Sequence, residues 1–488
     1  MRIHQHKIIL YLFPLVFLYP TTLGCNKTAA IDTYTLENIF VNKKSLELFV
    51  GDKEQLTAQA VPSIGHKPAF QWKSSDMNVA TVNQGMVEAI NEGEAIISVL
   101  FQSVQLDIPV IVRKKKTKTL ATLYDKQLNK QEISPEILIN GAGAYTDEGL
   151  MLTENGKIGK LNKSYALAER MVRYKVRFSS DAIAVFRDSE SDFFVFLDLP
   201  KKQISIGTQP LAVRKIESLA GNKDYLIEIE HIYQQANVRL IDLETKDTVE
   251  LSLINDGPGG QGAGALQMGF AVGMQWDHYC FGLESGTFML IKQISVFSLN
   301  DHVKLLIYGD SITQPEAYFP SSDFPHSWTQ LIINRLGGNA MSSGRGGGTI
   351  HMLLEYIKNE LPFLNTEYVM VTIGTNGGNN AKNLTELVEY IKSQGAIPIL
   401  NNIPCNSSGT QIENNILIET IRQEQKINGS LFDIATSISN DGQQVNKSLM
   451  YLEDLGSFEL QIYIHPNEKG GKKMFERTLI DVPEIYKW

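Results

Sequence analysis

The hydrophobic periodicity of this 488-residue chain changes near Val303, and the change separates two kinds of fold. Between residues 37 and 300, apolar residues recur at every second position in many short runs, which is the pattern of β-strands with one buried face. After Val303, short apolar runs alternate with segments in which apolar residues recur every three or four positions, as in amphipathic helices. Such alternation favours a parallel sheet covered by helices on both faces. The sequence therefore predicts a multidomain protein, with β-sandwiches first and a three-layer α/β domain at its carboxyl end.

The helix with the strongest pattern is predicted over residues 383–394. Its buried face would carry four apolar residues at helical spacing: Leu384, Leu387, Val388 and Ile391. Asn383 and Glu386 have the spacing of a capping box, and Gly395 supplies a stop. Strands predicted over residues 368–373 and 397–400 flank this helix, so the segment is typical of a strand–helix–strand unit.

Two β-modules are predicted before Val303. Residues 37–113 contain VGDKEQLTAQAVP and FQWKSSDMNVATVNQGMVEAINEGEAIISV, and this wording resembles bacterial group 2 Ig-like domains. The resemblance implies a small sandwich that acts as a spacer or adhesive module. Residues 121–300 have longer alternating runs and predict a second β-sandwich as an accessory domain. A jelly roll of the concanavalin type is one option for it, although no single motif decides this.

The first 25 residues are typical of a targeting segment. Arg2 and Lys7 precede an apolar stretch, residues 8–18, that is too short to span a bilayer. The segment closes with Thr-Leu-Gly-Cys and resembles a bacterial lipoprotein signal, which implies lipidation of Cys25. The protein would then be exported and held on a membrane by its lipid anchor, facing the periplasm or the cell exterior. Thr22 stands where such signals usually have Leu, and ordinary secretion with a nearby cleavage is the alternative.

Composition argues against two further classes of protein. The net charge of −9, with Arg113–Lys116 as the only basic run, argues against a nucleic-acid partner. Three cysteines are too few for a disulfide scaffold, so Cys280 and Cys405 are predicted to be buried thiols.

One serine in the α/β region follows directly on a predicted buried strand. Residues 305–313 read LLIYGDSIT, so Ser311 would lie at the carboxyl edge of the sheet, where open α/β sheets bind their ligands. A serine hydroxyl is a weak nucleophile that needs an adjacent base. The structural alternative is that Asp310 and Ser311 merely cap a following helix.

Three later segments, SSGRGGGT (342–349), VTIGTNGG (371–378) and IHPNEKGG (464–471), supply what such a serine would need. Together with GDS they resemble the SGNH, or GDSL, hydrolases over residues 303–486. The resemblance implies an esterase with Ser311 as nucleophile and His465 as base, working without a cofactor. It also implies an oxyanion hole made by the Ser311 N–H, the Gly344 N–H and the Asn376 side chain, with Gly346–Gly348 as alternative backbone donors. His326 and His351 lack metal-ligand spacing, so no metal site is predicted.

Two positions depart from the family pattern. Ser342 replaces the usual Asn, and Ile462 stands where the family has an Asp three residues before its histidine. That Asp would hold the imidazole in its useful tautomer. Three alternatives follow: a Ser–His dyad oriented by a backbone carbonyl, another acid from the preceding loop, or an impaired site that only binds. The candidate acids are Glu459, Asp454 and Glu453.

The functional hypothesis is a serine esterase that removes acyl groups, above all O-acetyl groups, from polysaccharides or glycan fragments. The exported, anchored organisation with attached β-modules motivates this substrate class. A lipid or aryl esterase is the alternative within enzymes. A catalytically impaired carbohydrate-binding or adhesion lipoprotein is the alternative outside them.

Overall fold

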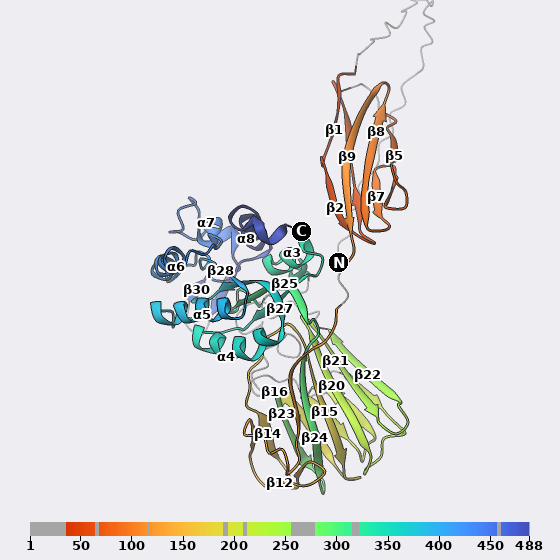
Figure 1. Ribbon diagram of the computed structural model, residues 1–488, viewed down its shortest axis with the longest axis vertical. Helices are drawn as coiled ribbons and strands as arrows, with labels where there is room; N and C mark the ends of the chain where they lie inside the picture. The colour runs from red at the N-terminus through yellow and green to blue at the C-terminus, as the bar shows by residue number, and fades with distance from the viewer. Residues whose placement is uncertain are drawn as a thin grey trace, which may run out of the picture. The chain divides into compact units, whose positions relative to one another are not determined.

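The computed structural model describes residues 36–63, 68–115, 118–188, 194–207, 212–254, 279–314, 322–455 and 460–487 (Figure 1). The predicted signal segment with Cys25, and the candidate acid Glu459, lie outside these residues. The chain divides into two compact units, of which the first ends at Arg113 and the second begins at Lys114.

The first unit consists of short strands around one apolar core. The strands are β1 (Asn38–Val41), β2 (Leu46–Phe49), β3 (Lys53–Gln55), β4 (Ala58–Val61), β5 (Gln71–Ser74), β6 (Ala80–Asn83), β7 (Met86–Ala89), β8 (Gly93–Phe101) and β9 (Val104–Arg113). They form sheets in the orders β2-β9-β8-β5, β3-β7-β6 and β1-β4. Ile97, Val99 and Val110 point into the core at every second position, which confirms the alternation seen in the sequence.

The second unit begins with a larger β-sandwich. Its strands are β10 (Ala121–Gln127), β11 (Ile137–Ile139), β12 (Gly143–Tyr145), β13 (Leu150–Leu152), β14 (Lys157–Leu161), β15 (Glu169–Phe178), β16 (Ile183–Asp188), β17 (Phe194–Asp198), β18 (Gln203–Ile206), β19 (Ala212–Lys215), β20 (Asp224–Ile232), β21 (Gln235–Asp242), β22 (Thr248–Ile254), β23 (Tyr279–Ser285) and β24 (Met289–Ser298). One sheet has the order β12-β13-β24-β15-β20-β21-β22 with β10 also on β24, and the other has the order β11-β14-β23-β16-β17-β18-β19.

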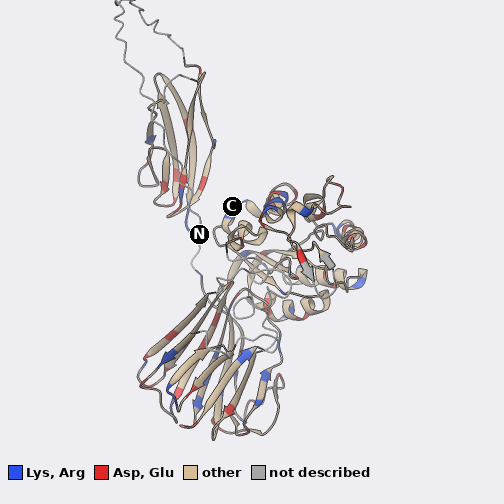
Figure 2. Cartoon of the chain, turned by 180° about the vertical axis from the view of Figure 1, so that it is seen from behind, with Lys and Arg blue, Asp and Glu red and all other residues tan. Residues whose placement is uncertain are grey.

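The two sheets of this sandwich bury aromatic side chains between them. Tyr174 of one sheet and Phe186 of the other pack with their ring centroids 4.7 Å apart. Acidic and basic residues are interspersed along the strands (Figure 2). On the face away from the core, Arg239 contacts both Glu228 and Glu230 at 2.8 and 2.5 Å. Such cross-strand ion pairs keep this face polar while the opposite face builds the core.

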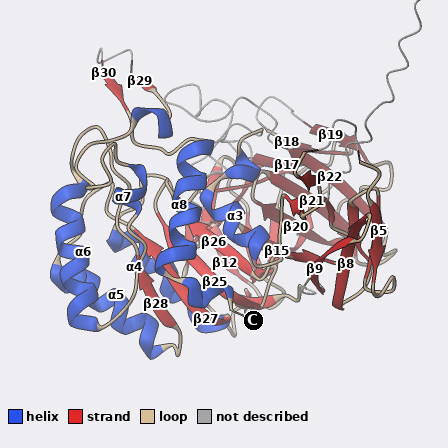
Figure 3. Cartoon of the chain, turned by 90° about the horizontal axis from the view of Figure 1, so that it is seen from above, coloured by secondary structure: helices blue, strands red, loops and turns tan. Residues whose placement is uncertain are grey.

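The chain then forms a parallel sheet between two layers of helices (Figure 3). Its strands β25 (His302–Gly309), β26 (Ala340–Gly344), β27 (Asn365–Thr372) and β28 (Ile397–Leu400) have the order β26-β25-β27-β28 and are parallel throughout. The helices are α3 (Trp328–Arg335), α4 (Ile350–Glu360), α5 (Ala381–Ser393), α6 (Gln411–Gln425), α7 (Phe432–Thr436) and α8 (Glu468–Asp481), with 3-10 turns η1 (Phe324–His326), η2 (Leu361–Phe363), η3 (Lys447–Leu449) and η5 (Pro483–Tyr486). A hairpin of β29 (Glu453–Leu455) and β30 (Leu460–Ile462) precedes α8.

Successive residues of β25 face opposite helix layers. Leu305 and Ile307 lie in one apolar cluster with residues of α3, α7 and α8, whereas Leu306 and Tyr308 lie in another with residues of α4, α5 and α6. Because both faces of the sheet are buried, β25 is apolar along nearly its whole length rather than alternating.

The predicted cap of α5 is wrong by about one turn. The capping box joins Asn380 and Asn383, each accepting from the other's backbone N–H at 2.9–3.0 Å, and Glu386 lies further along the helix. Asn383 is thus the third residue of the helix, and its side chain reaches back to the true N-cap. The predicted end is confirmed, because Gly395 follows the C-cap with φ +84°.

The sandwich and the α/β domain share one boundary within the second unit. The Ala168 N–H donates to the Ser342 carbonyl at the free edge of β26, at 2.9 Å. The buried Glu360 carboxylate at the end of α4 accepts the N–H groups of Ala166 and Leu167 at 2.5 and 3.2 Å. The sandwich therefore covers the edge of the parallel sheet that would otherwise expose unpaired backbone groups.

We expect residues 114–488 to fold as one unit, and residues 303–488 alone to give little soluble protein. Removing the sandwich would uncover the edge of β26 and take away the Ala166 and Leu167 N–H groups that bind the Glu360 carboxyl group. The comparison is the yield of soluble monomer and the resistance to limited proteolysis of the two fragments. A cooperative thermal unfolding transition for residues 303–488 alone would contradict this expectation.

Candidate active site

Ser311 lies in a tight turn directly after β25. The turn is closed by hydrogen bonds from the Thr313 N–H to the Asp310 carbonyl and from the Gln314 N–H to the Ser311 carbonyl, at 3.0 and 3.2 Å. The described range ends at Gln314, and no helix begins between Ser311 and that residue. Asp310 and Ser311 therefore do not serve as the N-cap of a helix that follows directly. The fully buried Asp310 carboxylate accepts the N–H groups of Ile312 and Thr375 at 3.1 and 3.3 Å. Burial raises the pKa of Asp310, although these hydrogen bonds oppose the shift.

Two buried aromatic residues hold the same turn from outside. The Tyr356 hydroxyl of α4 donates to the Gly309 carbonyl at 3.1 Å. The Trp328 indole of α3 donates to the Ile312 carbonyl at 2.8 Å. Both side chains are almost completely buried, so the backbone on either side of Ser311 is fixed by the two helix layers.

A continuous hydrogen-bond relay joins Ser311 to a histidine and an acid. The Ser311 Oγ lies 2.7 Å from His465 Nε2, although the two residues are 154 positions apart in the sequence. On the other side of the ring, His465 Nδ1 lies 2.7 Å from Glu453 Oε1. The same Glu453 oxygen accepts the His465 backbone N–H at 3.1 Å. This arrangement leaves Nε2 facing the serine hydroxyl when Nδ1 carries the proton.

The acid comes from the strand opposite the position where the family pattern has its Asp. Glu453 of β29 pairs directly with Ile462 of β30. Paired residues of an antiparallel hairpin present their side chains on one face, so an acid at either position can approach the same histidine. Of the acids considered from the sequence, the structure brings Glu453 to His465, and a carbonyl-oriented dyad is not what it contains.

Glu453 is buried, and its surroundings favour the ionised form of its carboxyl group. Burial acts to raise the pKa of this carboxyl, but the hydrogen bonds and charge of His465, with the Ile464 N–H, outweigh it and hold the pKa below its ordinary value. A carboxylate of this kind can stabilise positive charge that develops on the ring.

The loops after β25, β26 and β27 are bonded to one another. The Arg345 N–H donates to the Gly309 carbonyl at 3.1 Å, and the Gly346 N–H donates to Gln314 Oε1 at 2.7 Å. The Asn376 amide donates to the Gly348 carbonyl at 3.0 Å. Ser311, the glycine-rich turn and Asn376 therefore meet at one edge of the sheet.

Gly344 has a steric role in this arrangement. It pairs with Gly309 across β25 and β26, and a Cβ atom on Gly344 would lie 2.5 Å from the Thr313 carbonyl carbon. Backbone N–H groups alternate in direction along a strand. The Ser342 N–H faces the Tyr233 hydroxyl, at 3.5 Å, and the Arg345 N–H faces β25, so the Gly344 N–H points away from β25.

Among the described residues, the N–H of Gly347 has no hydrogen-bond partner, whereas those of Arg345, Gly346 and Gly348 are all engaged. Gly347 is exposed and has φ +66°, a conformation that favours glycine. The Ser311 N–H also lacks a partner within this part of the chain, and the exposed Asn376 amide has a second hydrogen to donate. The loops after β25, β26 and β27 thus each carry one of these N–H donors.

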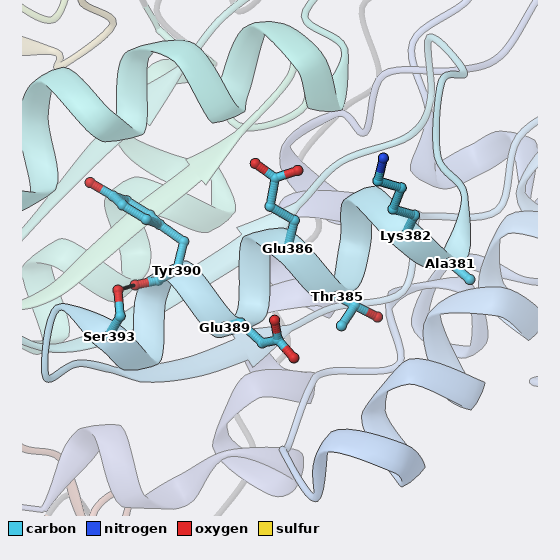
Figure 4. A pocket seen from close by; sticks show the side chains of 7 residues that line it. All are labelled: Ala381, Lys382, Thr385, Glu386, Glu389, Tyr390 and Ser393. Carbon is cyan, nitrogen blue, oxygen red and sulfur yellow. Dashed lines mark hydrogen bonds between the residues drawn. The ribbon is translucent and has the colours of Figure 1, made fainter.

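Other features of the described chain do not form a comparable site. A depression on the outer face of α5 is lined by Ala381, Lys382, Thr385, Glu386, Glu389, Tyr390 and Ser393, all from one helix (Figure 4). Lys358 lies 3.1 Å from Glu386 and over the Tyr390 ring. Within the described ranges no group of three or more His, Cys, Asp or Glu side chains could hold a metal ion.

Cys280 and Cys405 are both buried thiols, as predicted. Burial raises the pKa of Cys405 to about 11, so this thiol is not an activated nucleophile. None of the helices in the described part of the chain combines the length and apolarity needed to cross a bilayer.

Comparison with known proteins identifies the first unit. Residues 36–112 match the family of bacterial Ig-like domains (group 2), within one residue of the predicted boundaries at each end. This part of the chain is therefore an Ig-like domain. The chain matches no curated protein.

Solved structures give only distant likenesses. The exoplasmic/lumenal domain of VIP36 is 14% identical over 37% of this chain and 91% of its own, with a TM-score of 0.28. Arcelin-5, a lectin-like defense protein from Phaseolus vulgaris, is 11% identical over 38% of this chain and 100% of its own, with a TM-score of 0.28. A GDSL-like lipase from Bacteroides thetaiotaomicron is 15% identical over 36% of this chain and 85% of its own, with a TM-score of 0.27. Likeness at this level carries no argument about function, which rests on the geometry of the site.

Proposed function

We propose that residues 303–486 form an SGNH-like serine hydrolase that cleaves carboxylic esters. The observation that carries this proposal is the relay from the Ser311 hydroxyl through His465 to Glu453, with both links 2.7 Å long. A site used only for binding does not need a buried carboxylate that is hydrogen-bonded to His465 Nδ1. The relay therefore favours the active enzyme over the binding-only alternative.

The chemistry follows from the roles of these three side chains. Glu453 accepts a hydrogen bond from the Nδ1–H of His465 and so keeps Nε2 unprotonated. Nε2 can then take the proton of Ser311 as the serine attacks the acyl carbonyl. The bond to the alkoxide then breaks, the imidazolium gives this proton to the alkoxide, which leaves as an alcohol, and the acyl group stays on the Ser311 oxygen. Water, deprotonated by the same nitrogen, attacks the acyl-enzyme and releases a carboxylic acid, and Ser311 regains its proton. The proton transfers in these steps involve only Ser311, His465, the leaving alcohol and water.

The tetrahedral intermediates carry an oxyanion that needs preplaced donors, each worth roughly 3–4 kcal/mol. We assign this role to the Ser311 N–H, the Asn376 side chain and the Gly347 N–H. The family pattern implies the Gly344 N–H as the third donor, and it stays the alternative; we place Gly347 first because its N–H is exposed and unengaged among the described residues, whereas the Gly344 N–H points away from β25.

The substrate class is proposed from the organisation of the chain. The Ig-like domain and the predicted lipid anchor at Cys25 suit an exported protein on a membrane surface that faces polysaccharides. We therefore propose O-acetyl groups of polysaccharides or glycan fragments as the first substrates to test. A lipid or aryl esterase would differ by preferring long or aromatic acyl and alcohol groups over acetylated sugars.

The test is acetate release from a panel of acetylated polysaccharides by residues 28–488. Wild-type protein should release acetate, whereas Ser311→Ala and His465→Ala should lower the rate to the blank. Ser393→Ala, an exposed serine at the end of α5, is the matched control and should match the wild type.

Retained ester cleavage in Ser311→Ala or His465→Ala would overturn the assignment of nucleophile or base. No release from any ester, with polysaccharide binding intact, would move the assignment to the binding-only alternative.

A further inference from the structure

The displaced acid creates a positioning problem in the proposed enzyme. His465 follows β30, whereas Glu453 belongs to β29, and each strand of this hairpin is only three residues long. When acid and histidine share one short loop, local backbone geometry fixes their distance. Here the distance depends on how the arm that carries Glu453 is held.

Backbone contacts hold the two arms to each other. The Tyr451 N–H donates to the His465 carbonyl at 2.9 Å, and Met450 forms an antiparallel bridge with Pro466. The Asn467 side chain donates to the Met450 carbonyl at 3.1 Å. These bonds set the register of the arms, and through Asn467, the N-cap of α8, they tie the base of the Glu453 arm to that helix.

A side-chain contact supplies a second tie, to a different part of the domain and one residue nearer to Glu453. The Tyr451 hydroxyl, two residues before Glu453, donates to Asp323 Oδ2 at 2.7 Å. Asp323 immediately precedes η1, at the start of the segment that leads into α3. The same segment is fixed from the other side, because the Phe324 ring packs 5.7 Å from the ring of Tyr233 in the sandwich.

We propose that the Tyr451–Asp323 hydrogen bond is a positioning contact that holds the Glu453 carboxylate against His465. The inference rests on the proposed function and adds two residues that the motifs do not contain. Tyr451 and Asp323 touch no reacting atom. They act by anchoring one strand of the hairpin to the body of the domain.

The chemistry of the pair suits this role. A hydrogen bond to a carboxylate is shorter and stronger than one between neutral groups. Both side chains are half-buried, so water competes for the bond less than at a fully exposed site. Burial, with the hydrogen bond to Asp323, raises the pKa of Tyr451, so its hydroxyl remains a donor at any pH used for an esterase assay.

The experiment compares Tyr451→Phe, Asp323→Ala and Asp323→Asn in residues 28–488, with p-nitrophenyl acetate as the ester. Tyr451→Phe and Asp323→Ala should each lower kcat by about 10- to 100-fold with little change in KM, because a misplaced catalytic group costs rate on this scale. Asp323→Asn keeps an acceptor oxygen and should recover most of the rate. The double variant Tyr451→Phe/Asp323→Ala should be no slower than either single variant.

A second readout separates this inference from the proposed function. The proton between His465 Nδ1 and Glu453 should give a downfield resonance in the NMR spectrum of the wild type, which should broaden or vanish in Tyr451→Phe. If the wild type cleaves no ester, the proposed function fails, but the resonance still tests the contact. A Tyr451→Phe variant that keeps both wild-type kcat and the resonance would overturn the inference, as would equal losses in Asp323→Asn and Asp323→Ala.

Discussion

Replacing Glu453 by Ala should lower kcat by about 10³- to 10⁴-fold with little change in KM, the scale seen when a serine hydrolase loses its acid. Without the carboxylate, neither the Nδ1 tautomer nor the charge of the imidazolium is supported. Glu453→Gln should lose about as much, since its amide N–H can donate to Nδ1 and favour the tautomer in which Nε2 carries the proton. Steady-state kinetics with p-nitrophenyl acetate measure both losses.

Adding Ile462→Asp to Glu453→Ala should restore part of this loss, about tenfold or more over Glu453→Ala. The two positions are direct cross-strand partners, so an Asp at 462 would lie on the same face of the hairpin. Glu453→Ala/Ile462→Asn is the control, because it has nearly the same size without the charge. Wild-type kinetics in Glu453→Ala would show that the ring is oriented by something else.

Replacing Glu360 by Ala should destabilise residues 114–488 by about 3 kcal/mol or more. The substitution removes the acceptor of the Ala166 and Leu167 N–H groups, and the partner of the Ser343 hydroxyl at 2.9 Å. Glu360→Gln keeps an oxygen for both N–H groups and can donate to Ser343, so its cost should be small. Denaturant titrations of the three proteins give the free energies of unfolding.

Glu360 should also make stability fall as pH rises from about 4.5 to about 7. Burial is the main cause that raises the pKa of this carboxyl to about 7 in the folded protein, from 4.5. In that window the unfolded chain has lost a proton that the folded chain keeps, so the folded state loses about 3 kcal/mol across it. The loss is complete above about pH 7 and absent below pH 4.5. Glu360→Gln removes this term, so equal pH slopes for variant and wild type would contradict the assignment.

The secondary structure was largely predictable, because it follows from local patterns. Strands β27 and β28 and the end of α5 at Gly395 lie close to their predicted positions. The start of α5 was not predicted correctly, because Asn380 and Asn383 are both residues that can cap a helix. The choice between them depends on where the preceding loop leaves β27.

The site was predictable only in part. The four blocks, taken together as a family resemblance, pointed to Ser311 and His465, and the structure brings the two side chains together. The sequence did not distinguish Gly347 from the other glycines of its turn. In the structure, the Gly346 N–H donates to Gln314 and the Gly348 N–H donates to the Arg345 carbonyl, so the Gly347 N–H is the one left unengaged among these three.

The sequence by itself determined the order of the modules, the type of each element and two of the three members of the relay. These properties depend on periodicity and on short motifs, which act over a few neighbouring residues. Only the tertiary structure decided the acid and the free backbone donor. Glu453 reaches His465 through cross-strand register, and Gly347 is left free by contacts from a distant turn, so neither follows from spacing along the chain.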